Sequence, residues 1–169
     1  VLAESGAILD YLADRYDSGR QLSPELLPAQ APERVRYRYW MHYAEGSAMP
    51  PLLMSLVFAR VRKAPMPFFA RPIARGIADK VMKTFVGPQL KLHLDWMERE
   101  LTAAPWFAGE RFTAADIQMS FPIQAAASRA GSMEAYPKLK GFLQRIEQRP
   151  AYQRAVERGG PLNLGAGAA

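Results

Sequence analysis

Apolar residues return every three or four positions through most of the chain, which is the spacing expected of helices that each bury one face. The pattern runs through residues 1–16 and then stops. Residues 17–33 contain one glycine and three prolines, a density typical of a linker. A long helix is predicted from Glu33, and we expect Pro50-Pro51 to bend or break it because proline lacks a backbone N–H.

The apolar run at residues 52–58 fits either a buried strand or a buried helix by its pattern alone. Its helical neighbours, and the absence of a partner strand, favour the buried helix. The next long helix is predicted to continue past Gly87-Pro88 and to end before Pro105. Its expected apolar positions are Ile73, Ile77, Val81, Phe85, Leu90, Leu94, Met97 and Leu101.

The best-specified helix start lies at residues 112–117, Phe-Thr-Ala-Ala-Asp-Ile. Thr113 is placed to cap the helix, and the Asp116 carboxylate is placed to accept a hydrogen bond from the Thr113 amide. Phe112 and Ile117 have the spacing of the apolar contact that often accompanies such a cap. We therefore assign Thr113 and Asp116 structural roles, and no acid-base chemistry is assigned to Asp116.

Further turns and helices complete the predicted bundle. Pro122 is expected to kink the helix that follows Asp116, and Gly131 to end it. Two shorter helices are predicted to begin at Pro137 and Pro150, since proline suits the first turn. The buried face of the first is predicted to be Leu139, Phe142, Leu143 and Ile146. These elements predict an all-α fold, a helical bundle that ends in a flexible tail.

Composition narrows the kinds of site that the chain could hold. It contains no cysteine and only two histidines, His42 and His93, so disulfides, a cysteine nucleophile and a metal site are not expected. The longest strongly apolar stretch, residues 48–59, is shorter than the roughly 20 residues that span a bilayer. The first residues also lack the features of a secretory signal. We therefore expect a cytoplasmic protein with no membrane partner.

Basic residues are concentrated between Arg60 and Lys91, where eight Lys or Arg stand against one acid, Asp79, for a local charge of +7. The whole chain carries +6, so the remainder is close to neutral. The basic side chains fan over about half of a helix circumference, and no alternating aromatic residues are available to stack bases. A solvated face is favoured and nucleic acid is not an expected partner, with an anionic ligand or polyanion as the alternative.

Three motifs, in this order, resemble those of the glutathione transferase superfamily. They are residues 4–12 (Glu-Ser-Gly-Ala-Ile-Leu-Asp-Tyr-Leu), residues 112–117, and residues 149–152 (Arg-Pro-Ala-Tyr). Each motif alone has competitors, whereas their order and spacing, with a proline-rich linker after the first, carry the resemblance. Residues 39–53 (Tyr-Trp-Met-His-Tyr-Ala-Glu-Gly-Ser-Ala-Met-Pro-Pro-Leu-Leu) are most similar to the fungal and bacterial branch, so we expect a bacterial protein.

The resemblance implies a domain plan. Residues 1–16 would be the last helix of a thioredoxin-like glutathione-binding domain, and residues 17–33 the linker. Residues 34–158 would form the all-helical C-terminal domain of a glutathione transferase, followed by a tail at residues 159–169. The family's Ser, Tyr or Cys that lowers the pKa of the glutathione thiol would lie upstream of Val1. No catalytic residue is therefore expected in this chain, which alone should be inactive.

The resemblance also implies the contacts with glutathione, the co-substrate. Glu4 and Ser5 would hold its γ-glutamyl end, since a helix N-terminus offers free N–H groups and a partial positive charge to a carboxylate. A simple helix cap is the alternative role for this pair. His42 and Glu45 are candidates for contact with the glutathione of a partner subunit in a homodimer.

For the second, electrophilic substrate, Met49 and Leu53 are the candidates to line a hydrophobic pocket. Both residue types are also ordinary core residues, which is the alternative. The resemblance thus implies glutathione conjugation to electrophilic hydrophobic compounds by the intact protein, in detoxification and without a metal. A noncatalytic docking module is the alternative function, because the same helical domain serves that role in some translation factors and synthetases.

Overall fold

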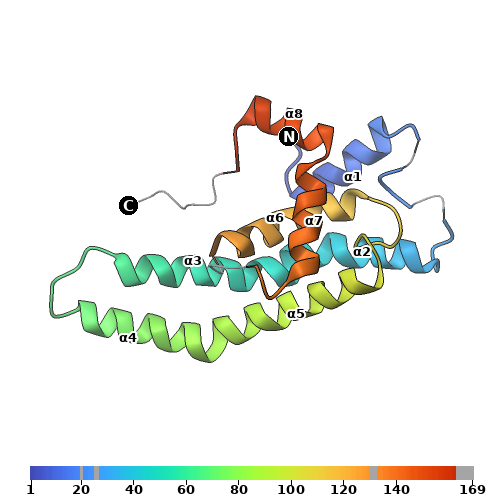
Figure 1. Ribbon diagram of the computed structural model, residues 1–169. Coiled ribbons are helices and arrows are strands. Elements are labelled where there is room, and N and C mark those ends of the chain that lie inside the picture. The colour runs from blue at the N-terminus through green and yellow to red at the C-terminus, as the bar shows by residue number, and fades with distance from the viewer. Residues whose placement is uncertain (20, 25–26, 130–132, 163–169) are drawn as a thin grey trace.

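The computed structural model describes residues 1–19, 21–24, 27–129 and 133–162 (Figure 1). Gly131, the expected helix stop, and residues 163–169 of the expected tail lie outside the described residues. Within the described part of the chain there are helices and no strand, which confirms the all-α prediction. The helices are α1 (Ser5–Tyr16), α2 (Pro32–Tyr43), α3 (Met49–Lys63), α4 (Arg71–Val81), α5 (Gly87–Ala103), α6 (Ala114–Arg129), α7 (Pro137–Glu147) and α8 (Pro150–Gly159).

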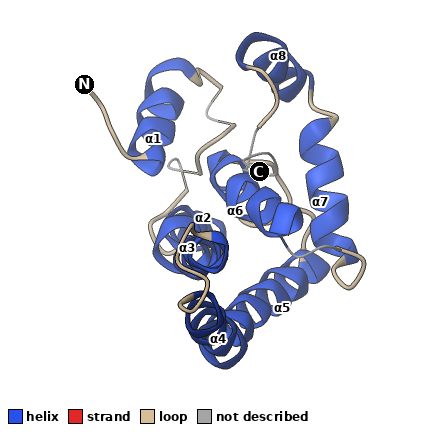
Figure 2. Cartoon of the chain, turned by 90° about the vertical axis from the view of Figure 1, so that its left-hand side faces the viewer, coloured by secondary structure: helices blue, strands red, loops and turns tan. Residues whose placement is uncertain are grey.

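Two long helical rods form the base of the bundle. The first runs from α2 into α3 and the second from α4 into α5, and the two lie antiparallel (Figure 1). Helix α6 packs mainly on α2 and also contacts α1, while α7 packs on α5 and α6. The view along the rods shows α1 and α8 on separate sides of α6 (Figure 2). No helix in the described part of the chain is long and apolar enough to cross a membrane.

A π-helical turn precedes the prolines in each rod. Ala44–Ala48 joins α2 to α3 just before Pro50-Pro51, and Met82–Val86 joins α4 to α5 just before Pro88. A proline ring collides with the carbonyl of the residue four positions earlier, and a wider turn gives that carbonyl room to move away. The predicted break at Pro50-Pro51 is therefore wrong, because the helix continues through it.

Close approach of the backbone at the second π turn requires a glycine. A Cβ added to Gly87 would lie 2.8 Å from the Met82 carbonyl oxygen, which accepts the wide-turn hydrogen bond from the Gly87 amide. The predicted continuation of this rod past Gly87-Pro88 is confirmed, as is its end before Pro105.

The core lies where α2, α5, α6 and α7 meet. Trp40 of α2 is 1% exposed, and its ring lies 4.5 Å from that of Phe107 in the loop between α5 and α6. Phe107 in turn lies 5.1 Å from Phe142 of α7, ring centre to ring centre. The predicted α7 face is confirmed in full, since Leu139, Phe142, Leu143 and Ile146 are all buried.

The apolar faces predicted for the outer ends of the rods are only partly buried. In α3 the run at residues 52–58 is helical, as predicted, yet Leu53 is 56% exposed while Leu52 is buried. In α4, Ile73 and Ile77 are 65% and 54% exposed, although the helical spacing was correct. These ends of α3 and α4 pack on one another and on the second π turn, so each helix keeps an uncovered apolar face.

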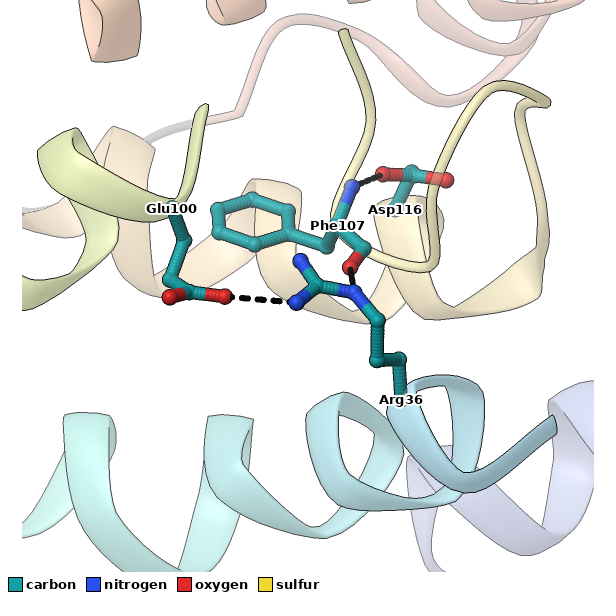
Figure 3. A network of polar contacts seen from close by, with 4 residues as sticks. All are labelled: Arg36, Glu100, Phe107 and Asp116. Carbon is teal, nitrogen blue, oxygen red and sulfur yellow. Dashed lines mark hydrogen bonds and ion pairs between the residues drawn. The ribbon is translucent and has the colours of Figure 1, made fainter. Parts of the chain in front are cut away.

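The predicted start of α6 is confirmed at Asp116, whose carboxylate is completely buried. Its Oδ2 accepts hydrogen bonds from the Thr113 amide at 2.8 Å and the Thr113 hydroxyl at 3.2 Å. Its Oδ1 accepts a third from the Phe107 amide at 2.9 Å. The Phe107 carbonyl accepts from Arg36, which also pairs with Glu100 at 2.9 Å (Figure 3). Asp116 therefore fixes both the helix start and the loop that carries Phe107.

Candidate functional site

The N-terminus of α1 is exposed, and its backbone geometry is unusual. Glu4 precedes the helix with a φ of 69°, in the left-handed region that residues other than glycine seldom adopt. The Glu4 carbonyl accepts the first hydrogen bond of the helix from the Ile8 amide, and its side chain makes no capping bond. Such strained backbone is concentrated at ligand sites, and the first-turn amides of a helix have no intrahelical acceptor. The simple-cap alternative thus lacks its hydrogen bond at Glu4.

The hydroxyl of Ser5 is held from the other half of the molecule. Gln118 of α6 donates a hydrogen bond from Nε2 to Ser5 Oγ at 2.8 Å, and Gln118 is 4% exposed. Ser5 Oγ in turn donates to Glu45 Oε1 at 3.4 Å, which is long for an O–H···O bond. Because Gln118 supplies the donor, the proton of the Ser5 hydroxyl is directed to an acceptor, such as a carboxylate.

Further bonds fix α1 against the bundle. The Tyr37 hydroxyl of α2 donates to Asp10 of α1 at 2.8 Å. At the end of α1, Asp17 accepts from the Leu22 amide at 2.6 Å, and the Leu22 carbonyl accepts from the Ala114 amide at 2.8 Å. The linker is thereby tied to the start of α6, and the N-terminus of α1 is preorganised for a ligand.

Charges of both signs surround this turn. The amides of a helix N-terminus and the Ser5 hydroxyl favour a carboxylate, while the exposed carboxylates of Glu4 and Glu45 favour an ammonium group. Together they have the chemistry to hold the zwitterionic end of an α-amino acid. The described residues contain no group of three or more His, Asp or Glu side chains arranged to hold a metal ion.

The other predicted site residues lie along the first rod. His42 is exposed near the end of α2, and Glu45, in the π turn, is brought to Ser5 of its own chain. Met49 is half-buried against the core, whereas Leu53, one turn further, is exposed. These two remain candidates for a second-substrate pocket.

The remaining histidine belongs to the structure rather than to this site. The Tyr43 hydroxyl lies 2.6 Å from His93 Nδ1 and links α2 to α5. Burial lowers the pKa of His93 and raises the pKa of Tyr43, so both groups are uncharged at neutral pH.

Gln118 is the functional residue that the sequence analysis missed. The helix pattern assigns it to α6 among apolar neighbours, and a buried amide side chain needs hydrogen-bond partners. A glutamine two residues after the capping Asp116, in an otherwise apolar helix, was the available signal. Its partner, Ser5, lies 113 positions away, and no local pattern identifies it.

Comparison with known proteins gives one consistent result. Residues 54–150 match the family described as glutathione S-transferase, C-terminal domain. Glutathione S-transferase 3 of Schizosaccharomyces pombe is 34% identical over 92% of this chain, which spans 62% of that relative's length. Glutathione S-transferase 1 of Saccharomyces cerevisiae is 31% identical over 94% of this chain and 67% of its own length.

Solved structures agree in fold. A glutathione S-transferase of Actinobacillus pleuropneumoniae superposes with a TM-score of 0.69 at 27% identity, covering 99% of this chain and 68% of that one. A sphingomonad glutathione S-transferase complexed with glutathione superposes with a TM-score of 0.68 at 24% identity, covering 95% of this chain and 69% of that one.

Proposed function

Because the chain belongs to the glutathione S-transferase family, we propose that the N-terminus of α1 forms part of a glutathione site. We further propose that the intact protein transfers glutathione to electrophilic hydrophobic compounds. The observation that carries the proposal is the Ser5 hydroxyl, held by buried Gln118 at an exposed helix N-terminus. The sphingomonad relative, which shares the fold, is described as complexed with glutathione, and this supports the choice of ligand.

In the proposed complex the γ-glutamyl end of glutathione meets both signs of charge at this turn. Its carboxylate accepts from the first-turn amides of α1 and from the Ser5 hydroxyl, replacing the long bond from Ser5 to Glu45. Its ammonium group pairs with Glu4 and with the released Glu45 carboxylate. This assigns Glu45 to the site of its own chain, while His42 stays a candidate for contact across a homodimer.

The remaining parts of the proposal concern the intact protein. Met49 and Leu53 would line the pocket for the electrophile, and conjugation would serve detoxification by a homodimer in the cytoplasm. Residues 1–16 would belong to the glutathione-binding domain and residues 34–158 to the helical domain, joined by the linker at residues 17–33.

Replacing Ser5 by alanine is expected to weaken glutathione binding about tenfold, because a hydrogen bond to a charged group is worth about 1.5–3 kcal/mol. The measurement is an NMR titration of the chain with glutathione, followed at the amides of residues 4–8. Ser120→Ala is the matched control, since the Ser120 hydroxyl bonds within α6 to the Ile117 carbonyl. Shifts confined to regions outside α1, with equal affinity for Ser5→Ala and parent, would favour the docking-module alternative.

Gln118 is expected to act through Ser5 as a positioning residue. Gln118→Leu should weaken glutathione binding about fivefold, by leaving the Ser5 hydroxyl free to turn away from the ligand. In a double-mutant cycle, adding Gln118→Leu to Ser5→Ala should cause little further loss, because the group that Gln118 orients is already gone. Additive losses in the same titration would show that Gln118 acts on folding alone.

A further inference from the structure

The turn between α3 and α4, residues 64–70, exposes two adjacent phenylalanines. Phe68 is 81% exposed and Phe69 is 66% exposed, and their rings stack edge to face with centres 5.7 Å apart. Along α4 the apolar surface continues at a spacing of four residues with Ile73 and Ile77, which are 65% and 54% exposed. A contiguous apolar surface of this kind marks an interaction site on a protein.

The turn is held in shape by its own hydrogen bonds. The Ala70 amide donates to the Pro67 carbonyl at 3.0 Å, and Arg71 Nε donates to the Met66 carbonyl at 3.2 Å. Prolines at positions 65 and 67 restrict the backbone further. The phenylalanine rings are therefore presented to the surroundings by an ordered loop.

Cations surround these rings on both sides. The end of α3 carries Arg60, Arg62 and Lys63, and the start of α4 carries Arg71 and Arg75. Residues 46–78 contain no acid, and the first one that follows, Asp79, pairs with Arg62 at 3.1 Å. An apolar tip within a ring of arginines and lysines is complementary to a surface that is apolar inside and anionic outside.

We propose that the α3–α4 turn docks on the surface of an anionic lipid bilayer. Phe68 and Phe69 enter the boundary between headgroups and acyl chains, and the basic residues pair with lipid phosphates. This is adsorption without a spanning helix, and it replaces the expectation from sequence alone of no membrane partner.

Two other occupants fit the charges less well. A twofold contact with a second copy would bring each basic cluster against its own equivalent, and like charges repel. A nucleic acid would satisfy the cations, but the aliphatic stripe of Ile73 and Ile77 offers no ring on which bases can stack. An anionic bilayer satisfies both the charge and the aliphatic stripe.

The docking surface is separate from the proposed glutathione site. The α3–α4 turn lies at the left end of the rods in Figure 1, whereas α1 lies toward the other end against α6. Adsorption through this turn would leave Ser5 accessible, so the proposal does not depend on the function of the α1 turn.

The test is co-sedimentation of the chain with vesicles of phosphatidylcholine and phosphatidylserine at a ratio of about two to one. We expect binding to these vesicles, none to pure phosphatidylcholine, and a loss of about tenfold or more in affinity for the double variant Phe68→Ser/Phe69→Ser. Leu92→Ser, at a position on α5 that is 60% exposed, is the matched control and should bind like the parent.

A second pair of variants separates charge from apolar contact. Arg60→Gln/Arg75→Gln should weaken vesicle binding severalfold at low salt, while Lys138→Gln/Lys140→Gln, exposed positions on α7, should not. Vesicle binding that is unchanged in the phenylalanine variant would overturn the proposal in favour of nonspecific attraction. A phenylalanine variant that turns a dimer into a monomer, with no vesicle binding by the parent, would overturn it in favour of a second copy.

Discussion

Replacing Trp40 by alanine is expected to lower the free energy of unfolding by about 4 kcal/mol, the largest effect of any single substitution considered for this fold. The Trp40 ring is 1% exposed and lies 4.5 Å from Phe107, 4.9 Å from Tyr43 and 6.4 Å from Trp96, centre to centre. It therefore joins α2 to α5 and to the loop before α6. Removing it leaves a cavity at the point where these elements meet.

The measurement is urea unfolding followed by circular dichroism at the helical band. Tyr39→Ala is the matched control, because Tyr39 is an aromatic residue on the same helix, next to Trp40, and is 46% exposed. Its loss should be about 1 kcal/mol, since half of its surface is already in water. Equal losses for the two variants would show that the α2 core contact does not stabilise the bundle as described.

The fold could be read from the sequence where a helix has one apolar face and a neighbour to cover it. The α7 face and the start of α6 are examples, since local spacing determines both. The same spacing in α4 predicted a helix correctly but predicted burial for Ile73 and Ile77, which are exposed. Periodicity reports that a face is apolar, and it does not report whether another element covers that face.

The two π turns were also beyond local reading. Proline in a helix predicts a break, and the compensation at Ala44–Ala48 comes from a widened turn upstream rather than from the proline positions themselves. That turn carries Glu45, whose carboxylate the structure brings to Ser5. The sequence motif could nominate Ser5, but contacts across 40 and 113 positions depend on how α1 packs against α2 and α6.

Replacing Asp116 by alanine is expected to lower the free energy of unfolding by about 3 kcal/mol at pH 7. The sequence pattern alone predicts a loss of roughly 1–2 kcal/mol, for a cap at the start of a helix. The structure raises this figure, because the carboxylate is fully buried and also accepts from the Phe107 amide, 9 positions away. Without it, the amides of Phe107 and Thr113 lose their acceptor in the interior.

The stabilising effect of Asp116 is also expected to depend on pH. Burial, the dominant cause, raises the pKa of Asp116 from 3.8 to about 6, against the opposing hydrogen bonds from Phe107 and Thr113. Between these values the folded chain binds a proton that the unfolded chain releases, so the contribution of this group is complete below pH 3.8 and falls as the pH rises through 6. A shift of this size corresponds to at most about 3 kcal/mol.

The difference in unfolding free energy between parent and Asp116→Ala isolates this group, because every other titrating residue is common to both proteins. That difference should be larger at pH 4.5 than at pH 7, in urea unfolding at a series of pH values. Asp95→Ala, which removes an exposed carboxylate whose pKa is lowered by its bond from Lys91, should show a small difference that changes in the opposite direction. A difference for Asp116→Ala that grows with pH would mean that the carboxylate is stabilised as an anion by its three donors, and that burial does not dominate its ionisation.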